Sequence, residues 1–328
     1  MTARRRSGAA KRPHVIVLGP QGDSPTLPAV CEDLVADGRL ARDGVLATIT
    51  AGWQEREGEL GRLEADTGRK TLDLGLYARA ETVAEEDPEL AAGHTAVQSR
   101  LKELRRAYNR RLAGAMTSLA ELNRLEGDAT VLDAEREDAL EELRRLDARH
   151  LARVAELRAA YLDEFAPHDR PVVRQQRRAI GSALKGVDVV AIAGGHVATL
   201  LNRLRLFDVA PLLAKKTIVA WSAGAMVLGE RVALFHDRPP WGPGNAEMFE
   251  HGLGVLEGVM FFPHATRRLD LEDVVRTRRL ARRFAPDTCV LLDPGSRMAF
   301  AADGTMSASD AFRLAADGSR SPADSRAA

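Results

Sequence analysis

The sequence predicts an α/β fold in which a doubly wound, mostly parallel sheet is interrupted by a long α-helical hairpin. Short apolar runs alternate with stretches of helical periodicity on both sides of the interruption, a pattern typical of parallel strands connected by helices. The interruption itself is rich in Leu, Ala, Arg and Glu and poor in β-forming residues. Hydrophobic residues make up 45% of the 328-residue chain, which is enough for a sizeable core.

The first part of the chain predicts buried strands with helices between them. Residues 14–19 (HVIVLG) are an apolar run closed by glycine and proline, and residues 44–52 (GVLATITAG) and 70–78 (KTLDLGLYA) follow as further strands. Helical spacing lies between the strands, in TLPAVCEDLVADGRL and in WQEREGELGRLEADTG, which stops at Gly68. These runs predict a sheet that helices cover on both faces.

The interruption, at about residues 92–167, predicts two long antiparallel helices. Gly127 and Asp128 separate two runs of apolar residues spaced by three and four, and Pro167 follows the second run. The repeated residues are Val97, Leu101, Leu104, Tyr108, Leu112, Leu119 and Leu122, and then Leu140, Leu143, Leu146, Val154, Leu157, Tyr161 and Phe165. A heptad-like seam indicates one helix packing on another, or contact with a partner or a second copy of the chain.

The α/β pattern resumes after the hairpin and completes a domain that we expect to span residues 14–310. Helices are predicted in VVRQQRRAIGSALKG, VATLLNRLRLFDVAPLLAKK and DLEDVVRTRRLARRFAP, and strands in VDVVAIAGG, TIVAW and GVLEGVMFFPH. TCVLLDPGSRMAFAADG predicts a closing β-hairpin. The whole order favours a flavodoxin-like fold. We expect disordered tails at residues 1–13, which are basic, and 311–328, which are small and polar.

The composition argues against several classes of function. Lys and Arg together number 47, as do Asp and Glu, so the balanced charge gives no case for binding nucleic acid or a membrane surface. No apolar run reaches the length of a membrane span, and the N-terminus lacks the apolar segment of a secretory signal, so we expect a cytoplasmic protein. Cys31 and Cys289 predict buried thiols. No metal-ligand spacing or phosphate loop stands out, and we expect no cofactor.

One serine ends a buried strand in TIVAWSAGAMVLGE, residues 217–230. A strand that turns into a helix through a single residue holds that residue in a tight, strained conformation, with its hydroxyl exposed at the tip. The neighbours must be small where the two backbones approach, and Ala220, Ala223, Gly224 and Ala225 meet that need. Ser222 is therefore a candidate nucleophile, and the N–H of Ala223 a candidate donor to an oxyanion. A helix N-cap is the alternative explanation.

A serine nucleophile needs a base, and the base needs a group that orients it. His264 closes a strand-like run and is expected at the carboxyl edge of the sheet, while His236 is its main competitor. Asp237 lies in the same loop as His236 and is the leading acid candidate. Weaker acid candidates are Asp208, Glu230 and Glu247.

A second oxyanion donor is expected from the preceding strand, which ends in IAGGH. Gly194 and Gly195 allow backbone N–H groups to come close to a substrate oxygen. A plain turn into the next helix is the alternative explanation, and the two are compatible.

Together these motifs resemble the dipeptidase E and cyanophycinase family of serine peptidases. That family has a fold similar to the class I glutamine amidotransferases, with serine in place of the nucleophilic cysteine. The resemblance lies in AGGH, AWSAGAM, HDRPP and FFPHATRR, and in CVLLDPGSRMAF, where Asp293 stands in place of a family glutamate. It covers about residues 14–80 and 172–305.

The resemblance implies that Ser222 is the nucleophile, His264 the general base and acid, and Asp237 its orienter. It implies that Gly195 and Ala223 donate to the oxyanion, while Gly194 shapes the turn. The candidates for substrate binding are His196, Trp221, Arg238 and Arg267. Three departures stand out, which are Ala220 in place of a frequent glycine, His196 in place of Asn or Asp, and the inserted hairpin, which the compact members lack.

The prediction from the sequence is a serine peptidase or amidohydrolase acting on a small peptide or isopeptide. Family substrates are dipeptides with N-terminal aspartate or the aspartyl-arginine polymer cyanophycin. An α/β-hydrolase esterase shares the chain order serine, acid, histidine, but the close spacing of Ser222 and Asp237 and the AGGH turn argue against it. A catalytically inactive scaffold, whose hairpin binds a partner or a second copy, is the remaining alternative.

Overall fold

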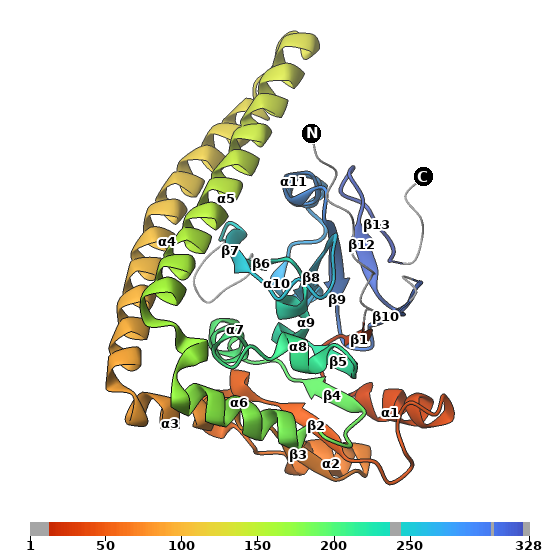
Figure 1. Ribbon diagram of the computed structural model, residues 1–328. Coiled ribbons are helices and arrows are strands. Elements are labelled where there is room, and N and C mark those ends of the chain that lie inside the picture. The colour runs from red at the N-terminus through yellow and green to blue at the C-terminus, as the bar shows by residue number, and fades with distance from the viewer. Residues whose placement is uncertain (1–12, 237–243, 303–304, 324–328) are drawn as a thin grey trace, which may run out of the picture.

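The computed structural model describes residues 13–236, 244–302 and 305–323 (Figure 1). Its largest sheet has seven strands in the order β11-β10-β1-β5-β4-β2-β3. The strands from β1 to β3 in that order are parallel, and β10 and β11 are antiparallel. Their bounds are β1 His14–Leu18, β2 Leu46–Ile49, β3 Thr71–Asp73, β4 Val189–Ile192, β5 Thr217–Trp221, β10 Arg297–Phe300 and β11 Met306–Ser309.

The strand order confirms the predicted doubly wound, mostly parallel sheet. The run β3-β2-β4-β5 follows the flavodoxin-type order 2-1-3-4, and β1 from the N-terminus occupies the fifth position. From β2 the chain adds β3 on one side, and then it crosses to add β4 on the other side, so the order of strand addition reverses between β2 and β4. In open α/β sheets ligands bind at the carboxyl ends of the strands beside such a reversal.

Both faces of the sheet are covered, as continuous apolar strands require. Alternate residues of β1 point to opposite faces: Val15 and Val17 join one buried cluster, and Ile16 and Leu18 join the other. The second cluster includes buried residues of α1 and α2, and the first includes those of α3, α6, α7 and α9. The helices are α1 Leu27–Ala36, α2 Gly61–Thr67, α3 Leu76–Glu86, α6 Pro171–Ala183, α7 Val197–Leu206, α8 Ala210–Leu213 and α9 Ala223–Leu228.

A second sheet, of order β13-β12-β9-β8, adjoins the first through the short connection from β9 to β10. The predicted closing hairpin is therefore wrong, because β9 pairs with β8 and β10 pairs with β1. The remaining elements are β6 Arg231–Leu234, β7 Glu247–His251, β8 Val259–Pro263, α10 Ala265–Arg268, α11 Val274–Phe284, β9 Thr288–Leu292, β12 Phe312–Leu314 and β13 Arg320–Pro322.

The expectation of a disordered tail from residue 311 is also wrong for the described residues. β12 and β13 form a hairpin that turns at Gly318, whose φ is +91°, and β12 pairs with the edge of β9. Ala311, Leu314 and Ala323 are buried against the body. The composition looked like a tail because the strands are short, but Asp-Gly is a common hairpin turn.

The predicted helical hairpin is present as α4, Pro88–Leu122, and α5, Ala129–Phe165 (Figure 1). Asp87 and Asp128 cap the two helices with their carboxylates, and α5 begins at the predicted Gly127–Asp128 boundary. One end of the hairpin packs beside the body and the other extends well beyond it. We call α4 and α5 together the arm.

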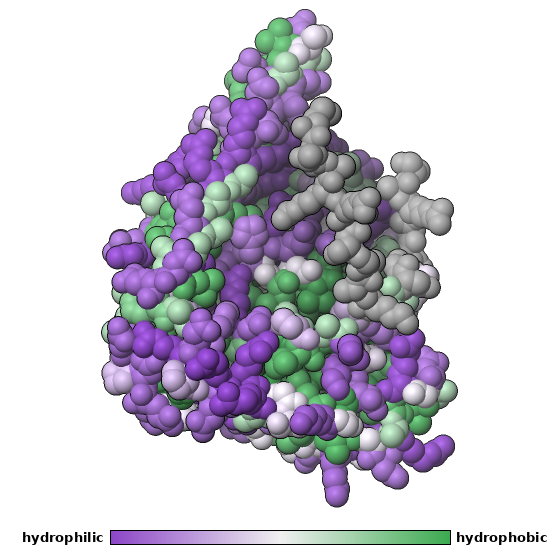
Figure 2. All heavy atoms as spheres, viewed as in Figure 1, coloured by the Kyte–Doolittle hydropathy of each residue, from purple (hydrophilic) through white to green (hydrophobic). Residues whose placement is uncertain are grey.

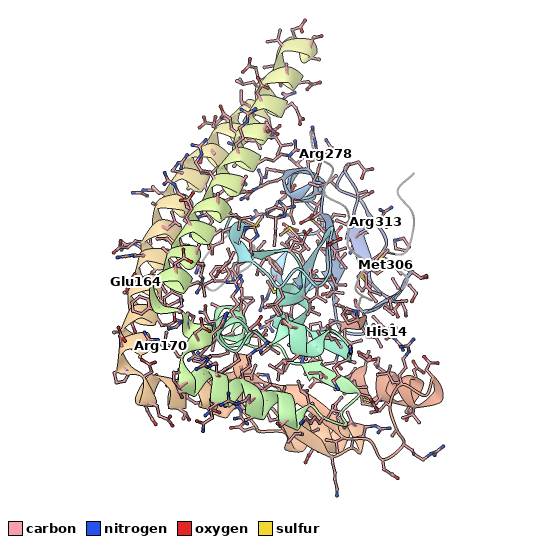
Figure 3. All side chains as sticks on the ribbon, in the orientation of Figure 1. His14, Glu164, Arg170, Arg278, Met306 and Arg313 are labelled. Carbon is pink, nitrogen blue, oxygen red and sulfur yellow. The ribbon has the colours of Figure 1, made fainter. Side chains whose placement is uncertain are left out.

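Arg170 closes the base of the arm. It lies where α5 ends, in the connection through the 3₁₀ turn η2, Pro167–Asp169 (Figure 3). Its Nε donates to the carbonyl of Phe165 at 3.0 Å, and its Nη1 donates to Glu89 at 2.9 Å. The end of α5 is thus tied to the start of α4 by one side chain.

A buried polar cluster joins the middle of the arm to the body. Arg283 of α11 forms a bidentate pair with Asp147 of α5, with both distances 2.7 Å. The hydroxyl of Tyr108 in α4 donates to Asp147 at 2.7 Å and accepts from the N–H of Met248 in β7 at 3.0 Å. Side chains of the two charged residues are only 2% and 4% exposed, so the cluster is desolvated and depends on its own pairing.

The two cysteines are buried thiols, as predicted. Burial raises the pKa of Cys289 to about 12 and also raises the pKa of Cys31. Neither is available as a nucleophile at neutral pH.

Across the described residues, no helix has both the length and the apolar character needed to cross a membrane.

Candidate active site

Ser222 stands alone between the last residue of β5 and the first of α9, in a strained backbone conformation. Its φ is 52° and its ψ is −120°, a region that residues with side chains rarely adopt. The side chain makes no capping hydrogen bond to α9, which removes the N-cap explanation. A partly exposed hydroxyl held on a strained strand-to-helix turn has the geometry of a nucleophile elbow.

The residues around Ser222 are small because two backbones pass it closely. A Cβ at Gly224 would overlap the carbonyl of Ile192 at the end of β4. A Cβ at Gly194 would lie 2.8 Å from the Cβ of Ser222 and 3.5 Å from its Oγ. The Gly-Gly turn after β4 therefore packs directly against the serine.

Three backbone donors at this place have no acceptor within the described part of the chain. Among the described residues, the N–H groups of Gly194, Gly195 and Ala223 donate no hydrogen bond, whereas the next N–H, of His196, donates to Gly52 at 2.6 Å. Gly195 has a φ of +110°, which requires glycine. The unpaired donors leave a place where a developing negative charge can be stabilised.

His264 follows β8 directly and has a left-handed backbone conformation, with φ 58° and ψ 37°. Its N–H donates to the carbonyl of Leu292 at 2.8 Å, which fixes the residue at the end of the strand pair. Burial of the half-buried ring lowers the pKa of His264, and the cations of Arg268 and Arg267 lower it further. The imidazole is therefore neutral at pH 7 and able to accept a proton.

Strand register places Ser222 and His264 on one rim of the molecule. β1 and β5 end together, so Gly19 lies beside Ser222, and Gly19 in turn lies against the carbonyl of Asp293. β8 and β9 end together, so Asp293 lies beside His264. Helix α9, which Ser222 begins, also packs on β8.

Asp293 is the described carboxylate that acts on His264. Its Oδ1 accepts from the N–H of Thr266 at 3.0 Å, at the start of α10, and its charge raises the pKa of His264 against the stronger lowering effects. The sequence argument named Asp293 only as a substitution for a family glutamate. Its position at the end of a strand beside the histidine strand was the available signal.

Asp237 and Arg238 lie outside the described residues. His236, the alternative base, stacks on Phe235 with ring centroids 6.4 Å apart, and Phe235 contacts Phe262 of β8 at 4.8 Å. Phe235 thus lies beside β8, the strand that His264 follows.

The weaker acid candidates are engaged away from this rim, which removes them as orienters. Their partners are Arg177 for Asp208, the N–H of Gly258 for Glu230, and Arg105 with Asn109 for Glu247.

The candidates for substrate binding divide into two groups. Trp221 is 6% exposed and belongs to the buried cluster that α1 covers, which gives it a packing role. His196 is exposed and caps α7, its Nδ1 accepting from the N–H of Thr199 at 3.2 Å. Arg267 is exposed, and its charge helps to lower the pKa of the nearby His264.

Gln54 is a residue of this edge that the sequence argument did not find. It lies in the 3₁₀ turn η1, Ala51–Arg56, after β2, and its φ of 60° and ψ of −123° nearly match those of Ser222. Its amide nitrogen lies 3.4 Å from Thr199 Oγ1, at the start of α7. Only its place after β2, beside the chain reversal, could have indicated it, because glutamine does not signal a positive φ.

Comparison with known proteins shows what this region is similar to. Residues 159–305 match the model of peptidase family S51, the dipeptidase E and cyanophycinase family. The S51 region runs from the end of α5 to β10 and contains Ser222, His264 and the Gly-Gly turn. The match supports a peptidase, and hence hydrolase chemistry.

A solved structure similar to the chain is that of a peptidase from an acI-B1 Actinobacterium. The two share 14% sequence identity with a TM-score of 0.46, over 95% of this chain and 94% of that chain. No curated protein gives a significant match. The family match begins at residue 159, near the end of α5. Most of the arm therefore lies outside the matched region.

Proposed function

We propose that the protein is a serine peptidase or amidohydrolase that cleaves a small peptide or isopeptide through an acyl-enzyme. The observation that carries the proposal is the conformation of Ser222, strained, uncapped and packed against the Gly-Gly turn. A strained residue persists only where the surrounding fold holds it, and such residues cluster at active sites.

In the proposed reaction, Ser222 attacks the carbonyl carbon of the scissile bond while His264 accepts the hydroxyl proton. The N–H groups of Gly195 and Ala223 stabilise the oxyanion of the tetrahedral intermediate. His264 then gives the proton to the leaving amine. Water, activated by the same histidine, releases the acid product and restores the serine.

The orienting acid has two candidates. Asp237 is the one that the family resemblance implies, and it lies outside the described residues. Asp293 is supported by its place beside His264 and by its effect on the pKa of that residue. A comparison of Asp293→Asn with Asp237→Asn separates them, because loss of the true orienter should reduce kcat by roughly 10⁴-fold.

The substrate is proposed to carry a carboxylate. Arg267 and Arg268 place two cations next to His264, and a guanidinium binds a carboxylate well. Both a dipeptide with N-terminal aspartate and an aspartyl isopeptide fit this charge. Parallel assays with the two substrate types distinguish a dipeptidase from a cyanophycinase-like enzyme.

A fluorophosphonate probe tests the nucleophile directly. We expect the purified protein to be labelled at Ser222, with the site located by mass spectrometry, because the probe reacts with serines activated by a neighbouring base. Ser222→Ala should remove the label and His264→Ala should strongly reduce it.

Ser182→Ala is a matched control, since Ser182 is exposed on α6 and should leave labelling unchanged. No labelling of a chain that circular dichroism shows to be folded would favour the inactive scaffold. Labelling together with hydrolysis of esters but not of peptides would favour the esterase.

The pH dependence of kcat/KM provides a second test. The reaction needs neutral His264, so activity should be present above its pKa and lost as the pH falls through it. Because burial and the two arginines lower that pKa, the acid limb should lie below the ordinary value of 6.5. Arg268→Gln should move the limb to higher pH, whereas Arg145→Gln, an exposed change on the arm, should not. A limb that stays in place in both variants contradicts His264 as the base.

A further inference from the structure

A cleft of about 410 Å³ lies where the arm meets the body. Its walls come from α5 between Val154 and Leu162, from the end of α7 and the loop after it, and from β7 and the loop that follows, with His94 of α4 beside them. Of the described candidate active-site residues, only Asp208 lines it, and Asp208 was removed above as an orienter. Ala155 and Ala159 line it and are exposed, so the cleft opens to solvent. Figure 2 shows hydrophilic residues over most of the arm and hydrophobic atoms in the hollow between arm and body.

One wall of the cleft holds two arginines on a single buried glutamate. Arg158 binds Glu250 in a bidentate pair at 2.8 and 2.9 Å, and Arg205 binds the same carboxylate. The Glu250 side chain is only 5% exposed. Burial, with Arg203 and Arg158, lowers the pKa of His94 in this wall to about 4, so it adds no charge at pH 7. The group carries a net charge of +1.

The other charged side chain in the lining does not neutralise that charge. Asp208 pairs with Arg177 at 3.0 Å, so that pair is already balanced. Within the described chain, Nη1 of Arg158 and Nε of Arg205 have no acceptor, and neither does the buried hydroxyl of Tyr161. The wall thus has a surplus of both positive charge and hydrogen-bond donors.

Most of the rest of the lining is apolar, with Asn202, His168 and His251 as its other polar residues. It includes Val154, Leu162, Leu204, Leu206, Val209 and Leu253. The volume equals roughly fourteen water molecules at about 30 Å³ each, which suits a ligand of about ten to fifteen non-hydrogen atoms. Ligand sites commonly combine an apolar lining with a few polar groups that fix the ligand's orientation.

We propose that this cleft is a second ligand site, which binds an organic monocarboxylate with an apolar body. The carboxylate lies against Arg158 and Arg205, and the body lies against the apolar lining. A single negative charge balances the surplus of the wall, whereas a dianion would exceed it. Two guanidinium groups with free N–H donors favour a carboxylate over a neutral group of the same size.

The position of the cleft connects this site to the nucleophile helix. The segment that follows β7 is hydrogen-bonded to the end of α9. The N–H of Leu253 donates to the carbonyl of Val227 at 2.8 Å, and the N–H of Val255 donates to the carbonyl of Leu228 at 2.9 Å. Another part of the lining, which includes Arg205, belongs to α7, and α7 packs on α9 and begins just after the Gly-Gly turn. The ligand would therefore contact two segments that support Ser222.

The probe is octanoate, which has about ten non-hydrogen atoms and so suits the volume of the cleft. Its binding to the full chain is measured by titration calorimetry. We expect one bound octanoate per chain and at least tenfold weaker binding of octanamide, its neutral counterpart, because a charge-assisted pair is lost. Arg205→Gln should weaken octanoate at least tenfold while leaving the bidentate pair of Arg158 in place. Ala159→Trp should abolish binding by filling the cleft, and it leaves every charge intact.

Arg203→Gln is the matched control, because Arg203 lies on the same helix, pairs with Glu81 and does not line the cleft. It should bind octanoate as the unmodified protein does. The proposal is overturned if octanoate does not bind, if octanamide binds equally well, or if Ala159→Trp has no effect. Tighter binding of octyl phosphate than of octanoate would also overturn it, since it would identify a dianion site. These measurements do not use the peptidase reaction, so their outcome is independent of the proposed function.

Discussion

Replacing Ser222 with glycine is expected to abolish hydrolysis and, at the same time, to stabilise the fold relative to Ser222→Ala. Activity should fall by at least about 10⁴-fold, because the attacking oxygen is gone. The free energy of unfolding should rise by about 1 kcal/mol over that of Ser222→Ala, since glycine adopts φ near 52° without the strain that a Cβ causes. Urea unfolding of the two variants measures the difference.

The comparison of Ser222→Gly with Ser222→Ala isolates the effect of backbone strain on stability. Both variants lack the hydroxyl, so they differ only in a Cβ at a residue of positive φ. Gly194 is a useful contrast, because alanine there would push a Cβ to 2.8 Å from that of Ser222 and should destabilise the fold. A glycine variant that is less stable than the alanine variant would contradict a strained elbow.

The largest effect on stability is expected from Arg283→Met. The change leaves Asp147 buried without its cation, and breaking a buried pair by removing one partner costs about 3 to 5 kcal/mol. This is a large part of the roughly 5 to 15 kcal/mol by which domains are usually stable. Thermal and urea unfolding should both detect it, and the arm should separate from the body first.

Two further variants test whether the loss of stability in Arg283→Met comes from the unpaired charge of Asp147. Arg282→Met removes a neighbouring arginine whose pair with Glu137 is 42% and 46% exposed, and it should cost at most about 1 kcal/mol. The double variant Arg283→Met with Asp147→Leu should recover part of the loss, because no unpaired charge remains. If the double variant is as unstable as Arg283→Met alone, the cost comes from packing and not from the uncompensated carboxylate.

The main architecture was predictable because its signals are local. Continuous apolar runs identified β4, β5 and β8, and the Gly127–Asp128 break located the turn of the arm. The assignment of β9 and β10 to different sheets was not predictable from their sequence. Pairing depends on distant strands, and a run such as TCVLL fits a hairpin as well as a parallel neighbour.

The candidate site was predictable where chemistry and sterics act within a few residues. The small neighbours of Ser222 indicated a tight strand-to-helix turn, and the paired glycines indicated a close approach of two backbones. The place of Asp293 depends on the register of β8 with β9, and the strain at Gln54 depends on the loops beside it. Neither property can be recognised from the identity of Asp293 or of Gln54.

The position of β1 has a consequence for how the protein is made. This first strand lies between β5 and β10, so both of its edges stay unpaired until the chain is synthesised past residue 217 and then past residue 300. At about 5 to 20 residues per second, the second neighbour emerges from the ribosome roughly 15 to 55 seconds after β1 does. During that interval an apolar Val-Ile-Val-Leu segment can pair with other nascent chains. We therefore expect β1 to be the strand of this sheet that most needs protection during synthesis.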